Sequence, residues 1–214
     1  MKLSDIFPAT SLKSKFACPV SVTHRDRTKL AEIARLKPAC MVEMGGSAWD
    51  RYVQAHPECD PQALAAYFQR SDPKLYLAME RHTGETVLRD ISYIVAEIED
   101  QGLEYACAAQ LLLAVTYPHV LRISDVTFCN VYQKIAKKDR RYQYQLYQGL
   151  GLFPEMLDNC KIYCREHAIR EITLCAANID LVPFFKMHGF AVDDTQVGRI
   201  AVEAGLGIPM TNAI

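Results

Sequence analysis

The sequence has few of the features that assign a protein to a class at once. It has 214 residues, only one tryptophan, and a formal net charge of −1 at pH 7. A net charge so close to zero gives no global attraction to nucleic acid or to an anionic membrane. Hydrophobic residues make up 50% and charged residues 23% of the chain, as in ordinary globular proteins long enough to bury a sizeable core. The composition therefore argues against a disordered or strongly basic protein.

Long apolar runs are also missing. A transmembrane helix needs about 18 nearly uninterrupted apolar residues, and the longest run here, residues 106–115, is broken by Gln110. The first twenty residues contain Lys2, Asp5 and Lys13, so we expect no secretory signal. These absences predict a cytoplasmic protein with no membrane partner.

The eight cysteines lack paired Cys-x-x-Cys spacings. We interpret them as reduced thiols packed like small apolar residues. Cys160, Cys164 and His167 have a spacing that could hold zinc on one helix face, but no fourth ligand is evident and the same positions form an apolar stripe. We therefore expect no metal. A Cys–His nucleophilic pair cannot be singled out among eight thiols.

The hydrophobic patterns predict an α/β (α+β) protein. Helices are expected first, then an antiparallel meander of three strands, then helix, strand, helix and strand. The expected helices cover residues 26–36, 61–70, 73–82 and 154–168, with a short one capped by Asp180, and the expected strands cover residues 19–23, 91–99, 103–117, 120–132, 169–176 and a last one from Phe190.

Two features of the first half are expected to interrupt helical structure. Pro38 should end the helix of residues 26–36. Residues 44–47, which include Gly45 and Gly46, should form a loop. The sole tryptophan, Trp49, follows this loop directly.

The sharpest local motif is Gln-Gly-Leu-Gly-Leu-Phe-Pro at residues 148–154. Gly149 and Gly151 allow a tight turn. The helix that follows starts without a Ser, Thr, Asp or Asn cap, so its first amides have no side-chain partner. Such amides suit an anion such as pyrophosphate, although a loop whose amides face water is equally consistent. The motif lacks the features of a Walker loop and of a dinucleotide fingerprint.

The spacing from Gln148 to Phe190 resembles that of the GNAT (GCN5-related N-acetyltransferase) superfamily. Gln148 and Gly151 match its Gln/Arg-x-x-Gly-x-Gly/Ala loop, and Asn178 and the segment from Phe184 to Phe190 are similar to its Asn-x-x-Ala-x-x-Phe-Tyr-x-x-x-Gly-Phe ending. The match continues without a gap between the two motifs. It is weaker over the three preceding strands and faint over residues 1–90.

The resemblance implies a single GNAT-like domain, residues 1–214, with a mixed central sheet of six to seven strands flanked by helices. Residues 1–90 would form a helical acceptor-side half, 91–132 the antiparallel strands, and 148–190 the coenzyme-A-binding half. It also implies transfer of an acyl group, acetyl above all, from acyl-coenzyme A to an amine. The implied coenzyme A contacts are Gln148, Gly149, Leu150, Gly151, Leu152, Phe153, Asn178 and Phe185.

Three positions depart from the family pattern. Phe153 replaces a small residue, so the loop holds its phosphate differently or folds the ring beneath the helix, and Leu181 replaces an alanine.

Phe185 stands where many members have the tyrosine that protonates the departing thiolate. A thiol with a pKa of about 8.5 leaves without much help, whereas acid–base assistance is worth about 10²- to 10⁴-fold. The change should therefore slow the reaction without abolishing it.

Candidate replacements for the acid or base are Asp125 and His188. His188 is three residues from Phe185 on one helix face, and Asp125, like Glu97, is on a predicted strand near the expected cleft. Tyr132 and Tyr147 could also donate a proton. Each residue also has a purely structural interpretation. His188 would be a histidine at a helix end, the two carboxylates would be solvated strand residues, and the tyrosines would only pack against their neighbours.

Residues 134–141 contain five basic residues and one acidic residue. This basic insert could contact the 3′-phosphate of coenzyme A or an acidic partner such as an acyl carrier protein, or could simply be solvated. A catalytically retired acyl-coenzyme-A-binding module and an acyl-carrier-protein-dependent enzyme therefore stay open beside the acyltransferase. Nucleic acid is disfavoured as a partner. The amine acceptor, the acyl length and the oligomeric state, a homodimer among the options, are not specified.

Overall fold

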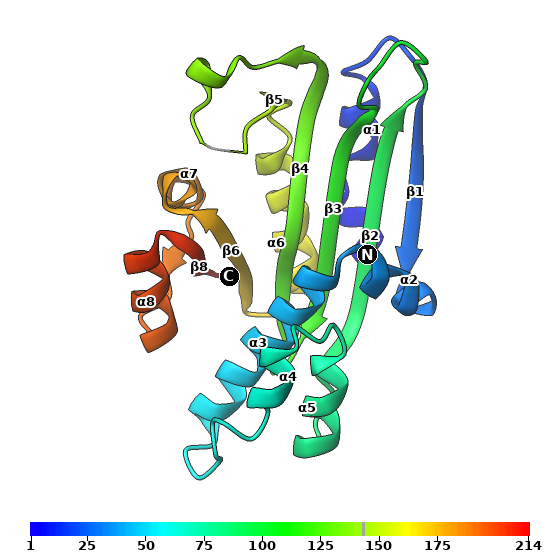
Figure 1. Ribbon diagram of the computed structural model, residues 1–214. Coiled ribbons are helices and arrows are strands. Elements are labelled where there is room, and N and C mark those ends of the chain that lie inside the picture. Colours follow the sequence, from blue (N-terminus) through cyan, green and yellow to red (C-terminus); the bar gives the residue numbers. More distant parts are fainter. Residues whose placement is uncertain (143) are drawn as a thin grey trace.

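The computed structural model describes residues 1–142 and 144–214, and a mixed eight-stranded sheet runs through them (Figure 1). Seven strands follow the order β1-β2-β3-β4-β6-β8-β7, and β5 pairs with β4 off this path. The expected α+β class with a mixed sheet is confirmed. The strands are β1 (Val20–Asp26), β2 (Leu88–Ile98), β3 (Cys107–Thr116), β4 (Val120–Lys134), β5 (Tyr147–Gly149), β6 (Glu171–Asn178), β7 (Ala191–Val192) and β8 (Leu206–Ala213).

Helices cover both faces of the sheet. One core lies beneath α6, α7 and the N-terminal helices, and a second lies beneath α2 to α5 (Figure 1). The α-helices are α1 (Ala9–Lys13), α2 (Leu30–Leu36), α3 (Pro38–Ala55), α4 (Ala65–Gln69), α5 (Leu75–Thr83), α6 (Phe153–Glu166), α7 (Val182–Met187) and α8 (Gln196–Ala204). The 3₁₀ turns are η1 (Leu3–Ile6), η2 (Arg27–Lys29), η3 (Lys137–Asp139) and η4 (Ile179–Leu181).

The strand β3 contributes to both cores. Leu111 and Leu113 belong to the core beneath α6, whereas Leu112 and Ala114 belong to the core beneath α3. A strand covered on both faces has apolar residues at consecutive positions, which explains the long apolar run in this part of the sequence. The predicted meander is confirmed, since β2, β3 and β4 pair antiparallel in succession.

The helix predicted over residues 26–36 ends before Pro38, as expected, because α2 stops at Leu36 and Lys37 is not helical, but the expected loop at residues 44–47 is wrong. Pro38 is the first residue of α3, where a missing N–H costs nothing, and the helix continues through Gly45 and Gly46. A Cβ at Gly45 would lie 2.9 Å from Cγ of Leu75, and one at Gly46 would lie 3.2 Å from Cε1 of Phe68. The glycines therefore allow α4 and α5 to pack closely on α3 rather than make a turn.

The C-terminal region differs from the expectation in three ways, the first being the helix α8, for which no helix was predicted. Asp180 lies inside η4 and does not cap α7, which begins at Val182 without a side-chain cap. The strand β8 was not predicted, and it lies between β6 and β7 in the sheet. Its sequence contains Gly207 and Pro209, residues that are unfavourable in strands.

Candidate functional site

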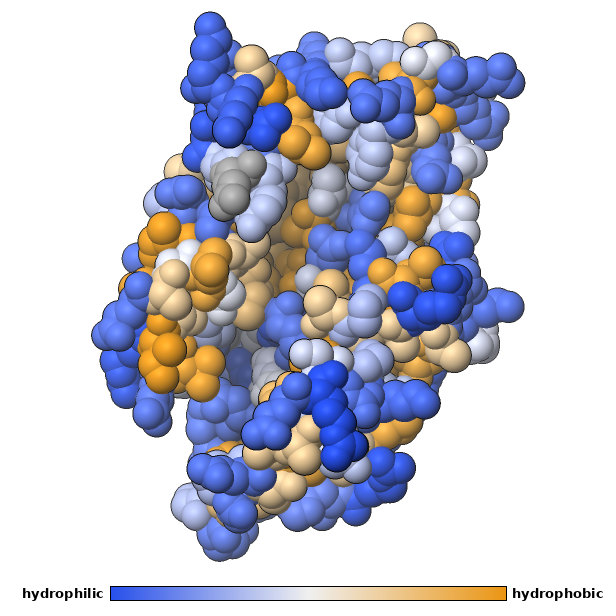
Figure 2. All heavy atoms as spheres, viewed as in Figure 1, coloured by the Kyte–Doolittle hydropathy of each residue, from blue (hydrophilic) through white to orange (hydrophobic). Residues whose placement is uncertain are grey.

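The parallel strands β4 and β6 pair over only three positions and then separate. Pairing runs from Leu121 with Ile172 to Ile123 with Leu174, after which β4 continues to Lys134 and β6 to Asn178. A cavity of about 350 Å³ opens at the point of separation. Figure 2 shows the hollow on this face of the molecule, beside the apolar surface of α7 and α8.

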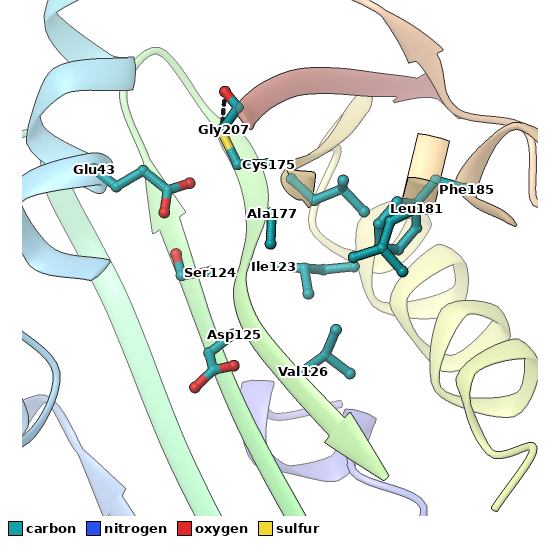
Figure 3. A pocket seen from close by; sticks show the side chains of 11 residues that line it. Glu43, Ile123, Ser124, Asp125, Val126, Cys175, Ala177, Leu181, Phe185 and Gly207 are labelled. Atoms are coloured by element: carbon teal, nitrogen blue, oxygen red, sulfur yellow. Dashed lines mark hydrogen bonds between the residues drawn. The ribbon is translucent and has the colours of Figure 1, made fainter. Parts of the chain in front are cut away.

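A β-bulge on β4 lies next to this cavity. Two consecutive residues of β3 pair with Ile123 and Asp125, so Ser124 is the extra residue. A bulge interrupts the alternation of side chains along a strand. Ser124 and Asp125 consequently project from the same face, toward α3, while Ile123 and Val126 project toward α6 (Figure 3).

The cavity has two contrasting walls (Figure 3). We call Glu43, Ser124 and Asp125 the polar wall. The facing residues, which we call the apolar wall, are Ile123, Val126, Leu181 and Phe185. The remaining lining residues are Leu174, Cys175, Ala177 and Gly207.

Asp125 is held by an ion pair with Lys37, which precedes α3. Nζ of Lys37 lies 2.7 Å from Oδ2 of Asp125, also donates to Gln110, and lies 5.4 Å from the ring centroid of Tyr93. Burial acts to lower the pKa of the Lys37 ammonium, but the hydrogen bond and charge of Asp125 raise it overall above its usual value. The lysine therefore stays charged and fixes one oxygen of the carboxylate.

Glu43 is held by an ion pair with Arg122, whose side chain is only 2% exposed. Arg122 also donates to Oγ of Ser47 at 3.0 Å and lies 3.5 Å from Oγ1 of Thr173. Burial acts to lower the pKa of this guanidinium, but the charge of Glu43 raises it overall. Arg122 thus joins β4, β6 and α3 where the strands begin to separate.

Cys175 lies on β6 and lines the cavity. Its Sγ lies 3.5 Å from the carbonyl oxygen of Gly207, to which it donates. Burial raises the pKa of the thiol to about 12, with the charge of Glu43 adding to the effect. Since the thiolate is the nucleophilic form of cysteine, Cys175 is a poor nucleophile near neutral pH.

The glycine loop before α6 turns at Gly151, whereas Gly149, also expected in the turn, lies in β5 and pairs with Cys129 of β4. Gly151 adopts a left-handed φ of 70°, and α6 begins after Leu152 without a side-chain cap. Among the described residues, the N–H groups of Gly151, Leu152, Phe153 and Glu155 donate to no protein acceptor. Four open amides at the positive end of a 14-residue helix form a favourable position for an anionic group.

Phe153 folds inward beneath this loop. Its ring is 7% exposed and packs on the rings of Phe184, Phe185 and His188, with centroids 5.1 to 5.6 Å apart. The phenylalanine that stands here in place of the small residue of the resembled family therefore connects the loop to α7. Phe185 continues from this cluster to the apolar wall of the cavity.

A backbone N–H of β4 faces the opening as well. Leu150 donates its N–H to the carbonyl oxygen of Phe128 at 3.1 Å, on the edge of β4 away from β3. The N–H and C=O groups of one strand residue point to the same edge, and alternate residues share an edge. The N–H of Val126 consequently points toward the gap between β4 and β6.

The remaining predicted cofactor residues lie around this loop. Gln148 and Gly149 are exposed in β5, while Leu150 packs against the core. Asn178 ends β6, is 6% exposed, and its Oδ1 is buried without a hydrogen-bond partner among the described residues. The basic insert forms a second hollow of about 270 Å³ with Asp180, lined by Lys137, Arg140, Arg141, Tyr142 and Asp180.

Several sequence candidates are not among the residues that line the cavity. His188 packs on Phe153 and Phe184, and Glu97 lies exposed on β2. The hydroxyl of Tyr132 donates to Asp100 at 2.8 Å, and Tyr147 stacks on Tyr105.

Trp49 is also away from the cavity. It is buried within α3, and its Nε1 donates to the carbonyl oxygen of Pro61 at 3.0 Å. Of the two proposed acid–base residues, only Asp125 lines the cavity.

The sequence interpretation missed Glu43, Ser124 and Cys175 as cavity residues. Glu43 precedes a segment interpreted as a loop, whereas a continuous helix would have placed it on the same face as Cys40 and Ser47. No local pattern marks Ser124 as a bulge. Only the pairing with β3 shows it.

The described residues contain no cluster of three or more His, Cys, Asp or Glu side chains suited to a metal ion. Cys160 and Cys164 are buried in the core beneath α6, and His167 stacks on Tyr163 and bonds to the carbonyl oxygen of Met1. Within the same residues, no helix has the length and apolar character needed to cross a membrane.

No protein-family model matches this chain, and no curated protein matches it. Solved structures of similar arrangement include a GNAT-family acetyltransferase from Listeria monocytogenes 4b F2365, at 11% identity and a TM-score of 0.39, covering 91% of this chain and 95% of that one. Another is a GNAT-family acetyltransferase from Staphylococcus aureus Mu50, at 13% identity and a TM-score of 0.36, covering 91% and 99%. These neighbours are acetyltransferases.

A third structure, described as a candidate streptothricin acetyltransferase from Bacillus anthracis strain Ames, was solved in complex with acetyl coenzyme A. It is 14% identical with a TM-score of 0.35, covering 63% of this chain and 67% of that one.

Proposed function

We propose that this protein is an acyl-coenzyme-A-dependent N-acyltransferase that transfers an acetyl group from acetyl-coenzyme A to an amine. The observation that carries the proposal is the combination of four open amides at the start of α6 with a cavity where β4 and β6 separate. The amides would bind the pyrophosphate, and the cavity would receive the acyl-thioester arm.

The residues divide into two roles in this proposal. Gly151, Leu152 and Phe153 supply backbone donors for phosphate oxygens, with Gln148, Gly149, Leu150 and Asn178 around them. Phe185 and the rest of the apolar wall contact the thioester arm. The N–H of Val126 is the proposed donor to the thioester oxygen, where negative charge develops during the reaction.

The reaction balances without a covalent enzyme intermediate. The lone pair of an uncharged amine attacks the thioester carbonyl carbon, the C–N bond forms and the C–S bond breaks. The proton lost by the nitrogen is transferred through Asp125, and the sulfur leaves with a proton as the thiol of coenzyme A. The raised pKa of Cys175 disfavours an acyl-cysteine route.

A catalytically retired acyl-coenzyme-A-binding module is the second candidate. It is favoured by Phe185, which offers no proton at the position where the resembled family has a tyrosine. A carrier-protein-dependent enzyme is the third, and the basic insert with its hollow favours it.

The first experiment is thermal denaturation with and without acetyl-coenzyme A, coenzyme A and an acetylated carrier protein. Stabilisation by acetyl-coenzyme A is expected because a ligand bound only to the folded state raises Tm. Chromatographic release of coenzyme A with a panel of amines then separates turnover from binding. No stabilisation by any acyl-coenzyme A would end both the enzyme and the binding-module proposals, and binding without product would favour the retired module.

A further inference from the structure

The strand β1 (Val20–Asp26) forms an open outer edge of the sheet. It pairs with β2 along its seven residues without a shift of register, and no other strand follows it in the sheet. Figure 1 shows β1 as the outermost strand, with α2 near one end of it. Soluble proteins usually protect such an edge by keeping the strand short, or with lysine, proline or a β-bulge. The segment from Val20 to Asp26 has none of these features.

Alternate residues of β1 point their backbone N–H and C=O groups away from the sheet. Glu99 donates its N–H to the carbonyl oxygen of Pro19 at 2.9 Å, so the carbonyl of Pro19 faces β2. Because successive residues of a strand alternate between its two edges, the backbone groups of Val20, Val22 and His24 face outward. These three residues have no further backbone hydrogen bond within the described part of the chain. The edge therefore presents three donors and three acceptors without partners.

The charged side chains of β1 lie at one end of the strand and do not protect its centre. Arg25 donates to Oε1 of Glu32 at 2.7 Å, and Asp26 accepts from the N–H of Thr28 at 2.9 Å. Both are thus held by contacts within the same molecule. The centre of the strand carries Val22, which is 38% exposed. An exposed β-branched residue on an open edge favours pairing with another strand.

We propose that β1 pairs antiparallel with β1 of a second copy of this chain, about a two-fold axis at Val22. In this register Val22 exchanges two backbone hydrogen bonds with its counterpart, and Val20 exchanges two with His24 of the second copy. Every outward N–H therefore meets an outward C=O. The side chains also fit, because two valines meet on the axis and Ser21 faces Thr23 on the other side of the sheet. The charged residues lie beyond the paired segment.

A second copy supplies the kind of partner that this edge requires. An added strand must be an extended segment with open backbone groups at alternate positions. The strand β7, at the opposite edge of the sheet, has only two residues, whereas β1 matches its own length. The strands β2 and β3 separate β1 from the cavity, so the contact does not depend on the proposed function. Pairing of one strand is small beside a standard interface, so we expect a concentration-dependent dimer.

The test is sedimentation equilibrium of the full chain, together with hydrogen exchange of β1 at low and high protein concentration. We expect a reversible dimer. The amides of Val22 and His24 should exchange more slowly in it, because both would donate to the second copy. A dimer that leaves these amides in fast exchange would overturn the proposal, since its contact would lie elsewhere. A monomer at every concentration up to about 1 mM would overturn it as well.

Charge variants at Val22 test the position of the axis. Val22→Lys and Val22→Glu each place like charges opposite one another, so each should raise the Kd of the dimer about tenfold. Mixing the two variants places a lysine opposite a glutamate and should restore a dimer that contains one copy of each. Val202→Lys is the matched control, because Val202 lies on α8 and is 41% exposed. It should dimerise like the unmodified protein.

Both Val22 variants should keep the pairing of β1 with β2, because the backbone groups of Val22 face away from β2. Thermal denaturation checks that they fold, and hydrogen exchange of the unmodified protein decides the proposal if they do not. A dimer that persists in Val22→Lys, or that mixing fails to restore, would overturn the proposed pairing. Dissociation in Val202→Lys alone would overturn it too and would assign the contact to α8.

Discussion

The two sides of the cavity differ in how far they can be understood from local sequence. The proposed cofactor side consists of a loop, the start of α6 and α7, all within residues 148–190. The proposed acceptor side combines Glu43 from α3 with Ser124 and Asp125 from β4. The first side uses backbone amides that a local motif sets free, and the second uses side chains that meet only after folding. Substitutions on the first side therefore alter one continuous segment of the chain. Substitutions on the second side alter contacts between α3 and the sheet.

The largest effect is expected from Glu43→Ala. Removing one partner of a fully buried ion pair costs about 3–5 kcal/mol; because the Glu43 side chain is 33% exposed, the loss should lie below that range, but Arg122, at 2% exposure, would lose its counter-charge. Urea denaturation should show the loss as a lower midpoint. The double variant Arg122→Met with Glu43→Leu should recover most of it.

Asp125→Ala serves as the comparison, because the Lys37 side chain is 20% exposed and can reach water. We expect a smaller loss of unfolding free energy in Asp125→Ala than in Glu43→Ala. Equal losses in Asp125→Ala and Glu43→Ala would contradict the assignment of Arg122 as the buried link between β4 and α3.

On the cofactor side, Gly151→Val should weaken acetyl-coenzyme A binding by about tenfold or more. A β-branched residue is strained in the left-handed region, at a cost of about 1–2 kcal/mol, and the loop would rearrange to relieve the strain. Gly84→Val is the matched control, since Gly84 has a φ of 75° and, like Gly151, nothing within 4 Å of an added Cβ.

Both valine variants should lose similar stability, but only Gly151→Val should lose ligand affinity in calorimetric titration. Equal acetyl-coenzyme A affinity in the two variants would place the pyrophosphate away from this loop.

A smaller effect is expected from Phe185→Tyr. The new hydroxyl lies at the apolar wall and can protonate the departing sulfur, so kcat should rise by less than about 10²-fold, the lower range of acid catalysis. KM for acetyl-coenzyme A should stay nearly constant. Phe184→Tyr, one residue away and 36% exposed, should leave kcat unchanged, and a similar gain in both variants would argue against direct proton donation.

The smallest effect is expected from the basic insert. Lys137→Ala and Arg141→Ala each remove one charge from the hollow beside Asp180. Exposed charges contribute about 0.2–1 kcal/mol, so the KM for acetyl-coenzyme A should rise about twofold per charge at low salt and less at 0.5 M salt, where screening is stronger. Lys138→Ala in the same 3₁₀ turn, outside the hollow, is the control. No dependence on salt would indicate that the insert does not contact a phosphate.

Much of the fold could be predicted from periodicity, and the failures have identifiable causes. The meander of β2 to β4 and the helix α6 have strong patterns and were predicted with small shifts in their bounds. The continuous α3 was missed because Gly45 and Gly46 suggest a turn, whereas they serve close packing with Leu75 and Phe68. The strand β8 was missed because pairing with β6 stabilises it despite Gly207 and Pro209.

The sequence by itself indicated a turn at the glycines before α6 and the uncapped start of that helix, because both depend on residues adjacent in the chain. It also placed Asp125 on a strand and Phe185 on a short helix. Only the tertiary structure decided that Ser124 would be a bulge and that Glu43 would face it. Bulge position follows from the pairing of β4 with β3, and the approach of α3 follows from the packing of distant side chains and the buried Arg122.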